Sequence, residues 1–139
     1  MTIKRGIIAG NFDVIHPGYI KMFEDTKDNV CDYLIIALQG DPTIERPFKC
    51  MPVQTVSERE YILQSIRYVD EVIHYNTEAE LLELLQSTDY DVRIIGSDYR
   101  GVEFTGKYLD KDIYYHSRAH EYSLTDLKKR ITEQMLSKN

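Results

Sequence analysis

The sequence predicts an α/β fold, a doubly wound parallel sheet of five strands with helices on both faces. Three observations support this prediction. Short apolar runs alternate with segments of helical periodicity along the chain, which is the order that builds βαβ units. The longest runs are continuously apolar, as are parallel strands that are covered on both faces. The length of 139 residues fits a single domain over residues 1–139 with its own core.

The five predicted strands are apolar runs bounded by polar or turn-forming residues. They lie at residues 5–9, 32–38, 69–74, 92–95 and 113–115. Ligands of such folds bind outside the carboxyl ends of the strands, near the point where the strand order reverses. Motifs that directly follow a strand are therefore the first candidates for a functional site.

The predicted helices have clear signals at their amino ends. Pro17 suits the first turn of a helix. Thr55 with Glu58, and Thr77 with Glu80, form Thr-x-x-Glu capping signatures. The helix after Thr55 is expected to run through residue 67. A final helix over residues 123–135 carries apolar side chains on one side, namely Leu124, Leu127, Ile131 and Leu136.

The charge balance limits the possible partners. The chain has 17 Lys and Arg against 23 Asp and Glu, a formal net charge of −6. Long nucleic acid is not an expected partner, because its backbone is bound by a basic face. No membrane partner is expected either, because no apolar run approaches the ~20 residues that span a bilayer. We expect a cytoplasmic protein in which local basic groups hold any phosphate.

The two cysteines, Cys31 and Cys50, lack the spacing of metal ligands. We expect both to be free thiols in a reducing compartment. No metal site on the protein is predicted.

Residues 10–19, Gly-Asn-Phe-Asp-Val-Ile-His-Pro-Gly-Tyr, join the first predicted strand to the first predicted helix. A glycine and a small polar residue after a strand let the backbone approach a ligand closely. The helix amino terminus then supplies N–H groups and a positive dipole end. His16 lies where its imidazole can add a donor to a bound phosphate; the alternative is that it only caps or packs the turn. The segment predicts a phosphate site.

The same segment resembles the signature of the nucleotidyltransferase superfamily, Gly-x-Phe-Asp followed by His-x-Gly-His. Residues 6–40 are similar to the corresponding part of the glycerol-3-phosphate cytidylyltransferases, a resemblance that implies a Rossmann-like fold. In that family the histidines contact the triphosphate and stabilise charge around the α-phosphate, so the resemblance implies that His16 is catalytic. It implies that Asp13 shapes the turn. It also implies nucleotide-binding roles for Gly10, Asn11, Phe12, Gly18 and Tyr19.

One letter departs from this signature, because Tyr19 stands where the second histidine is expected. Tyr19 follows His16 by three residues and so lies on the same helical face. A phenol donates one hydrogen bond but is uncharged at neutral pH. Three interpretations are open: Tyr19 replaces the donor, another cation compensates, or the domain binds nucleotide without turnover. We favour the first two together, because the other motif residues are present.

Residues 48–72 resemble the cytidylyltransferase pattern of a loop lysine, a helical Glu-Arg pair and the string Arg-Tyr-Val-Asp-Glu-Val. On this resemblance Lys49 is a catalytic residue that reaches the phosphates, although an ordinary surface lysine is the alternative. Arg59 is either a substrate-side or a structural arginine. Asp70 is a substrate-side candidate that could instead anchor the turn between helix and strand.

The segment that begins at Gly96 resembles the family's Met-Gly-Asp-Asp-Trp-x-Gly motif and follows the fourth predicted strand. The resemblance implies that Gly96 and Asp98 bind nucleotide. Gly96 permits close approach of the backbone. Asp98 is an acceptor for a base amino group, a ribose hydroxyl or a substrate hydroxyl.

Residues 117–125 take the position of the family's Arg-Thr-Glu-Gly-Ile-Ser-Thr-Thr motif. On this resemblance Arg118 is a catalytic residue, a permanent forked cation for the phosphates. Ser123 and Thr125 are nucleotide-binding residues, with a simple N-cap as the alternative for Ser123. His120 is a substrate-side candidate that could offset the histidine missing at position 19.

The resemblance covers nearly the whole chain and implies transfer of a cytidylyl group from CTP to a small phosphorylated alcohol or sugar, with release of pyrophosphate. Glycerol 3-phosphate is the default acceptor, Mg²⁺ is expected on the CTP phosphates, and a homodimer is possible. An adenylyltransferase acting on a sugar phosphate or cofactor precursor is the nearest alternative. A catalytically silent nucleotide-binding module is the alternative from another class.

Overall fold

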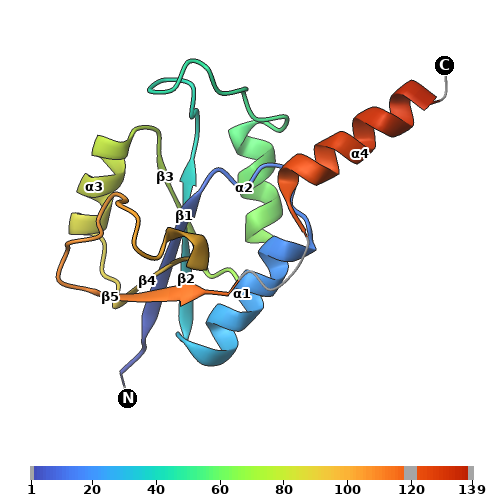
Figure 1. Ribbon diagram of the computed structural model, residues 1–139. Helices are drawn as coiled ribbons and strands as arrows, with labels where there is room; N and C mark the ends of the chain where they lie inside the picture. Colours follow the sequence, from blue (N-terminus) through green and yellow to red (C-terminus); the bar gives the residue numbers. More distant parts are fainter. Residues whose placement is uncertain (1, 118–121, 138–139) are drawn as a thin grey trace.

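The computed structural model describes residues 2–117 and 122–137, and its five strands form one all-parallel sheet (Figure 1). The strands are β1 (Arg5–Gly10), β2 (Tyr33–Gln39), β3 (Glu71–Tyr75), β4 (Val92–Gly96) and β5 (Asp112–His116). The helices are α1 (Pro17–Asn29), α2 (Val56–Gln64), α3 (Glu78–Ser87) and α4 (Leu124–Ser137), with a short 3-10 helix η1 (Ser97–Tyr99) after β4. The predicted α/β fold is confirmed.

The strand order in the sheet is β3-β2-β1-β4-β5. The chain builds outward from β1 to β3, then crosses back to place β4 on the other side of β1. The order therefore reverses between β1 and β4, and ligands of such sheets bind at the carboxyl ends of the strands that flank this point. The segments that follow β1 and β4 are the turn into α1 and the loop that begins with η1.

Helices α1 and α2 pack on one face of the sheet (Figure 1). Phe23 of α1 and Leu63 of α2 are fully buried there, against the side chains of Leu34, Ile36 and Leu38 from β2. Alternate residues of a strand point to opposite faces, so the residues between these three belong to the other layer. Burying one such side chain contributes about 1.5–3 kcal/mol.

Helix α3 covers the opposite face. Its Leu81 and Leu85 pack with Tyr90 and with the strand residues Ile7 and Ile35. The two apolar clusters confirm helices on both faces. Helix α3 and the irregular segment after β4 both lie near this second face (Figure 1).

Both predicted capping signatures are present. The Thr55 side chain accepts the Glu58 N–H and the Glu58 side chain accepts the Thr55 N–H, which completes a capping box at α2. Thr77 likewise accepts the Glu80 N–H at α3. These contacts are local, which is why the sequence reveals them.

Helix α2 ends at Gln64, so the expectation of a helix through residue 67 is wrong. The chain leaves α2 in tight turns in which backbone N–H groups donate three residues back, from Ser65, Ile66 and Val69. The Asp70 N–H then donates to the Leu34 carbonyl and aligns the chain with β2 before β3 begins. Pairing with the sheet thus overrides the helical pattern.

Helix α4 forms as predicted but projects away from the sheet (Figure 1). None of its residues is buried, and Ile131 and Leu136 are 48% and 69% exposed. The outer part of the predicted apolar side is therefore exposed, while Leu124 and Leu127 are half-buried. No helix in residues 2–117 and 122–137 is long and apolar enough to cross a membrane.

Candidate functional site

A cavity of about 540 Å³ opens at the carboxyl ends of β1 and β4. It lies at the strand-order reversal, where the topology places a ligand. Six residues that the sequence analysis assigned to the site line it: Gly10, Asn11, Phe12, Tyr19, Lys49 and Gly96. These residues come from three distant segments of the sequence, and the sheet brings them together.

The turn between β1 and α1 has an unusual backbone. Phe12 and Val14 both have positive φ angles, 48° and 47°, in the left-handed region. A branched side chain such as that of Val14 is rare there, and such a conformation persists only where surrounding contacts enforce it. The Phe12 ring is buried against Tyr19 and Phe23. The backbone strain lies directly beside the cavity.

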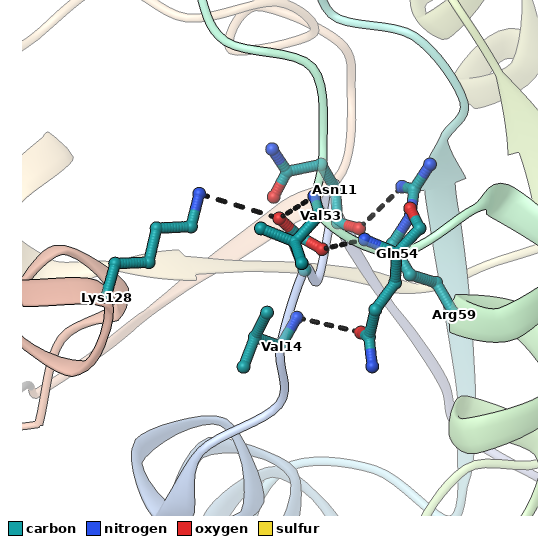
Figure 2. Close-up of polar contacts among 7 residues, drawn as sticks. Asn11, Val14, Val53, Gln54, Arg59 and Lys128 are labelled. Atoms are coloured by element: carbon teal, nitrogen blue, oxygen red, sulfur yellow. Dashed lines mark hydrogen bonds and ion pairs between the residues drawn. The ribbon is translucent and has the colours of Figure 1, made fainter. Parts of the chain in front are cut away.

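Asp13 enforces this turn from inside the protein. Its carboxylate is 1% exposed and accepts the backbone N–H groups of Val53 and Gln54 at 2.7 and 3.0 Å. The Gln54 side chain accepts the Val14 N–H at 2.9 Å, and Lys128 Nζ of α4 lies 3.6 Å from the carboxylate (Figure 2). Asp13 therefore shapes the turn, as the sequence analysis expected, and joins it to the end of the loop that carries Lys49.

Arg59 makes the contacts of a structural arginine, one of the two roles that the sequence analysis gave it beside that of a substrate-side candidate. It is 1% exposed, and its guanidinium donates to four backbone carbonyls, those of Asn11, Gln39, Gly40 and Gln54, at 2.6–3.1 Å. Figure 2 shows Arg59 beside Asn11 and Gln54. Burial lowers the pKa of the guanidinium and nearby Asp13 opposes this effect. A guanidinium committed to these carbonyls holds the ends of β1 and β2 and the start of α2 together.

His16 is the N-cap of α1. Its Nδ1 accepts the Gly18 N–H at 3.0 Å, and the side chain is largely buried. A ring nitrogen that accepts an N–H carries no proton, so the proton of the neutral imidazole is on Nε2. The capping role that was the alternative for His16 is therefore present, and the cap fixes the imidazole in a form whose other nitrogen is a donor. Gly18 is buried at the helix start and supplies the N–H for this contact.

Tyr19 packs directly on His16. The two rings have centroids 4.4 Å apart and are inclined by 30°, and Tyr122 lies beyond, with its ring 6.4 Å from that of His16. Tyr19 also lines the cavity, whereas His16 is not among its lining residues. The residue at the position of the missing histidine is thus in contact with both the remaining histidine and the space for a ligand.

Lys49 belongs to the loop of residues 40–54 and is exposed. It lines the cavity together with Arg46. Its backbone N–H donates to the Arg46 carbonyl at 2.9 Å. The structure thus places Lys49 where a cation can reach a ligand in the cavity, as the resemblance implies.

The residues after β4 and before α4 are only partly brought to the cavity. Gly96 lines it, but Asp98 in η1 is exposed and does not. Ser123 is the N-cap of α4, because its hydroxyl accepts the Asp126 N–H at 3.0 Å, and Thr125 is exposed on that helix. The candidates Arg118 and His120 lie outside the described residues.

Asp70, a substrate-side candidate of the sequence analysis, anchors the amino end of the sheet. Its carboxylate accepts the Leu34 N–H at 2.8 Å and pairs with Lys27 at 2.6 Å. It directly precedes β3. Because the cavity lies at the carboxyl ends of the strands, Asp70 is at the opposite edge and takes the anchoring role that was the alternative.

The sequence analysis missed one wall of the cavity. Tyr75, Glu78, Arg93, Phe104 and Thr105 line it from the side of α3. A usable signal was present at Arg93, a charged residue in the apolar run Val-Arg-Ile-Ile of a predicted buried strand. A strand interior does not take a charge without a specific reason.

The protein's own groups offer no obvious metal cage in the described part of the chain, where no cluster of three or more His, Cys, Asp or Glu is placed to hold an ion. Cys31 is buried and Cys50 is exposed, and neither is in a disulfide. Burial raises the pKa of the Cys31 thiol, which keeps it in the less reactive protonated form.

Comparison with known proteins agrees with this geometry. A family model described as cytidylyltransferase-like matches residues 7–131. The glycerol-3-phosphate cytidylyltransferase of Bacillus spizizenii is 32% identical over 129 residues, which are 91% of this chain and 96% of that protein. The enzyme of the same name from Staphylococcus aureus is 30% identical over 93% of this chain and 96% of that protein.

A second kind of relative is much longer than this chain. The bifunctional protein HldE of Gluconacetobacter diazotrophicus is 33% identical over 107 residues, which are 75% of this chain and 21% of that protein. The matched region is therefore about a fifth of that relative's length.

Solved structures show the same fold at low sequence identity. The lipopolysaccharide core biosynthesis protein of Thermoplasma volcanium has a TM-score of 0.61 at 18% identity, over 96% of this chain and 89% of that one. A protein of unknown function from Archaeoglobus fulgidus has a TM-score of 0.58 at 10% identity, over 86% and 93%. The family match over residues 7–131, with full-length relatives at 30% identity or more, establishes that this chain belongs to the cytidylyltransferase-like family of nucleotidyltransferases.

Proposed function

We propose that the protein transfers a cytidylyl group from CTP to the phosphate of a small alcohol or sugar, with glycerol 3-phosphate as the default acceptor. The observation that carries this proposal is one cavity lined by the turn after β1, by Tyr19, whose ring packs on His16, and by the loop cation Lys49. Relatives named glycerol-3-phosphate cytidylyltransferase match nearly the full chain and support the choice of CTP and of this acceptor.

In the proposed reaction a phosphate oxygen of the acceptor attacks the α-phosphorus of CTP. A new P–O bond forms, the bond between the α-phosphorus and the bridging oxygen breaks, and pyrophosphate leaves with that electron pair. No covalent intermediate with the protein is needed. Catalysis then consists of positioning the two reactants and stabilising the charge that develops on the phosphate oxygens.

His16 and the start of α1 supply donors for this charge. The cap holds the imidazole by Nδ1, and we assign its Nε2–H as a donor to a phosphate oxygen. The amino end of α1 adds a positive dipole end and backbone N–H groups. Tyr19 adds a hydroxyl donor in the place of the second histidine.

Lys49 and Arg118 are the cations that we assign to the triphosphate. Lys49 lines the cavity from an exposed loop, and Arg118 enters this proposal from its position in the family motif. Ser123 and Thr125, at the start of α4, and Asp98 are assigned to nucleotide on the same basis, and His120 stays a substrate-side candidate. The net charge of −6 makes such local cations necessary.

Mg²⁺ enters the proposal as an ion carried on the CTP phosphates. The described residues hold no cluster of metal ligands. This fits an ion held mainly by substrate, because Mg²⁺ keeps several waters and is commonly bound by one or two carboxylates together with substrate phosphates. When bound, it would neutralise part of the triphosphate charge. We assign no residue as its ligand. The proposal further places the protein in the cytoplasm and is compatible with a homodimer.

Pyrophosphate release tests the proposal. The purified protein is incubated with Mg²⁺, one nucleoside triphosphate and one phosphorylated polyol or sugar at a time. We expect release with CTP and an acceptor, and formation of the matching cytidine diphosphate conjugate. Release with ATP instead of CTP would favour the adenylyltransferase alternative. Tight CTP binding without release for any acceptor would favour the silent nucleotide-binding module.

A further inference from the structure

Arg93 is a charged residue in the interior of the sheet, on the wall of the cavity that adjoins α3. It is the second residue of β4, lines the cavity and is 6% exposed. Its Nη1 donates to the Thr105 carbonyl at 2.8 Å, and its guanidinium carbon lies 5.5 Å from the centroid of the Phe104 ring. Its Nε is buried and has no hydrogen-bond partner in the described chain.

Arg93 has no ion-pair partner within the described chain. Three cations line the cavity, Arg46, Lys49 and Arg93, and within residues 2–117 and 122–137 only Arg46 has a carboxylate within 4.0 Å. That carboxylate is Glu78, whose other oxygen accepts the Thr105 hydroxyl at 2.7 Å. The second acidic residue of the cavity, Glu103, is paired with Lys107 at 3.6 Å.

A buried guanidinium without an anion is costly. Burial lowers the pKa of Arg93, although nearby Tyr90, Tyr75 and Glu78 oppose this effect. An arginine nevertheless stays charged in a protein, and an uncompensated buried charge costs several kcal/mol. A ligand anion that enters the cavity would satisfy both the charge and the remaining N–H donors.

The position of Arg93 separates it from the reacting end of the cavity. Arg93 pairs with Ile7 of β1, three residues before Gly10. At ~3.3 Å per residue its backbone lies about 10 Å from the strand end at which the phosphates are expected. Arg93 therefore lines the cavity from a position further back along the strands than the turn at residues 10–19.

We infer that the preferred acceptor is not glycerol 3-phosphate, the default of the proposed function, but a phosphorylated alcohol with a carboxylate at the end remote from its phosphate, and that Arg93 binds this carboxylate. The inference rests on the proposed function for the identity of the reacting phosphate. The planar fork of a guanidinium matches the two oxygens of a carboxylate. Phe104 and the Thr105 carbonyl hold that fork in place from one side.

Two acceptors that differ in one group test this inference. Glycerol 3-phosphate and 3-phosphoglycerate share a three-carbon chain, a hydroxyl and a phosphate, but one ends in a hydroxymethyl group and the other in a carboxylate. We expect kcat/KM with CTP to be about tenfold or more higher for 3-phosphoglycerate, since a charge-assisted hydrogen bond contributes about 1.5–3 kcal/mol. Equal values, or a preference for glycerol 3-phosphate, would overturn the inference.

Substitutions assign the preference to Arg93. Arg93→Met removes the charge but keeps much of the volume, and it is expected to abolish the preference between the two acceptors. Arg93→Lys keeps a positive charge but lacks the planar fork of the guanidinium. It is expected to retain only part of the preference for 3-phosphoglycerate. The matched control is Arg46→Met, which removes a half-exposed cation from the same cavity and should change both kcat/KM values by the same factor. A preference that survives in Arg93→Met would contradict the assignment.

Binding measured without turnover separates this inference from the proposed function. Titration calorimetry of each acceptor into the protein, with no nucleotide present, should show tighter binding of 3-phosphoglycerate that is lost in Arg93→Met. If no acceptor releases pyrophosphate but this difference in binding persists, the proposed function fails and the carboxylate site stands. If pyrophosphate is released without any such difference, the carboxylate site fails alone. Urea unfolding checks that Arg93→Met is folded, and Arg93→Lys serves if it is not.

Discussion

Asp13 accepts a hydrogen bond from Gln54, and together with a second bond at its neighbour Val14 this contact connects the turn after β1 to the loop before α2. The Asp13 carboxylate accepts the Gln54 backbone N–H at 3.0 Å, while the Gln54 side chain accepts the N–H of Val14, the next residue after Asp13, at 2.9 Å. The turn has two residues in the left-handed region, so its conformation depends on these contacts. The phosphate turn and the loop of Lys49 form one connected unit.

Asp13→Asn should destabilise the protein. The amide that replaces one carboxylate oxygen cannot accept an N–H, so either Val53 or Gln54 keeps a donor without a partner. A buried unsatisfied group costs about 1–3 kcal/mol, and urea unfolding measures this loss. Lys128→Met is the control, because it removes only the 3.6 Å ion pair from a partly exposed lysine and should cost less than about 1 kcal/mol. Equal losses would show that the ion pair, not the hydrogen bonds, holds the turn.

Arg59→Met should destabilise the protein severely, by about 3–5 kcal/mol, because it leaves buried carbonyls without donors. Arg59→Lys should not restore the loss, since a single ammonium cannot span carbonyls from three segments. Urea unfolding without any ligand is the measurement. Normal stability in Arg59→Met, combined with lost turnover, would instead return Arg59 to a role at the substrate.

His16→Asn and His16→Ala separate capping from catalysis. Asparagine keeps an oxygen that can accept the Gly18 N–H, so it should retain the stability of α1, whereas alanine should lose about 0.5–2 kcal/mol. Both should lower kcat by about 100-fold or more, because both remove the donor to the phosphates. Thermal unfolding and pyrophosphate release measure the two effects. Full activity in His16→Asn would show that His16 only caps α1 and has no catalytic role.

Tyr19→Phe isolates the hydroxyl at the position of the missing histidine. Phenylalanine preserves the ring that packs on His16 and Phe12, so the fold should be unchanged. We expect kcat to fall about tenfold, the value of one hydrogen bond to a charged oxygen. Tyr19→His, which restores a donor, should retain more activity than Tyr19→Phe. Wild-type kcat in Tyr19→Phe would exclude the hydroxyl as a donor.

Asp25 should make the free energy of unfolding fall with pH in the acid range. Partial burial raises the pKa of Asp25, but hydrogen bonds from His116, Asn29 and Tyr114 outweigh it and hold the pKa below its ordinary value of 3.8. Because the pKa is lowered by folding, ionised Asp25 stabilises the protein fully at pH values above its pKa in the unfolded chain. This stabilisation is lost as the pH falls through its pKa in the folded protein.

The measurement is the free energy of unfolding in urea from about pH 6 to about pH 2. Asp25→Asn should have lower stability at the upper end and a smaller loss below pH 3.8 than the wild type, because its group no longer titrates. Glu83→Gln, at an exposed position of α3, is the matched control and should follow the wild-type curve. Parallel curves for Asp25→Asn and the wild type would contradict the prediction.

The parts of the fold that local chemistry determines could be predicted from the sequence. Strand runs, the caps at Thr55 and Thr77 and the turn at residues 10–19 depend on neighbours in the sequence. The roles of Arg59 and Asp70 could not be decided from the sequence, because each residue type can either stabilise the fold or bind a ligand. Only the distant residues that they contact distinguish the two roles. Those partners, such as the carbonyls of Asn11 and Gly40 for Arg59, are 48 and 19 residues away.

The candidate site likewise has one part that the sequence could reveal and one part that it could not. The residues of the turn after β1 carry a recognisable motif, and they line the cavity as expected. The α3 wall has no motif, because it is assembled from the ends of separate elements. Arg93 was visible only as a charge in an apolar run, and what that charge faces depends on the segment after β4, which contributes Phe104 and Thr105.

Helix α4 has a consequence for how the molecule unfolds. It has 14 residues and buries none of them, and an isolated helix of that length is marginal in water. Its backbone amides should therefore exchange with solvent through local opening at a low free energy, while those of the central strands exchange only on global unfolding. Loss of helical signal on heating should begin in α4 before the sheet melts, whereas the sheet and the helices packed on it should unfold in one cooperative transition.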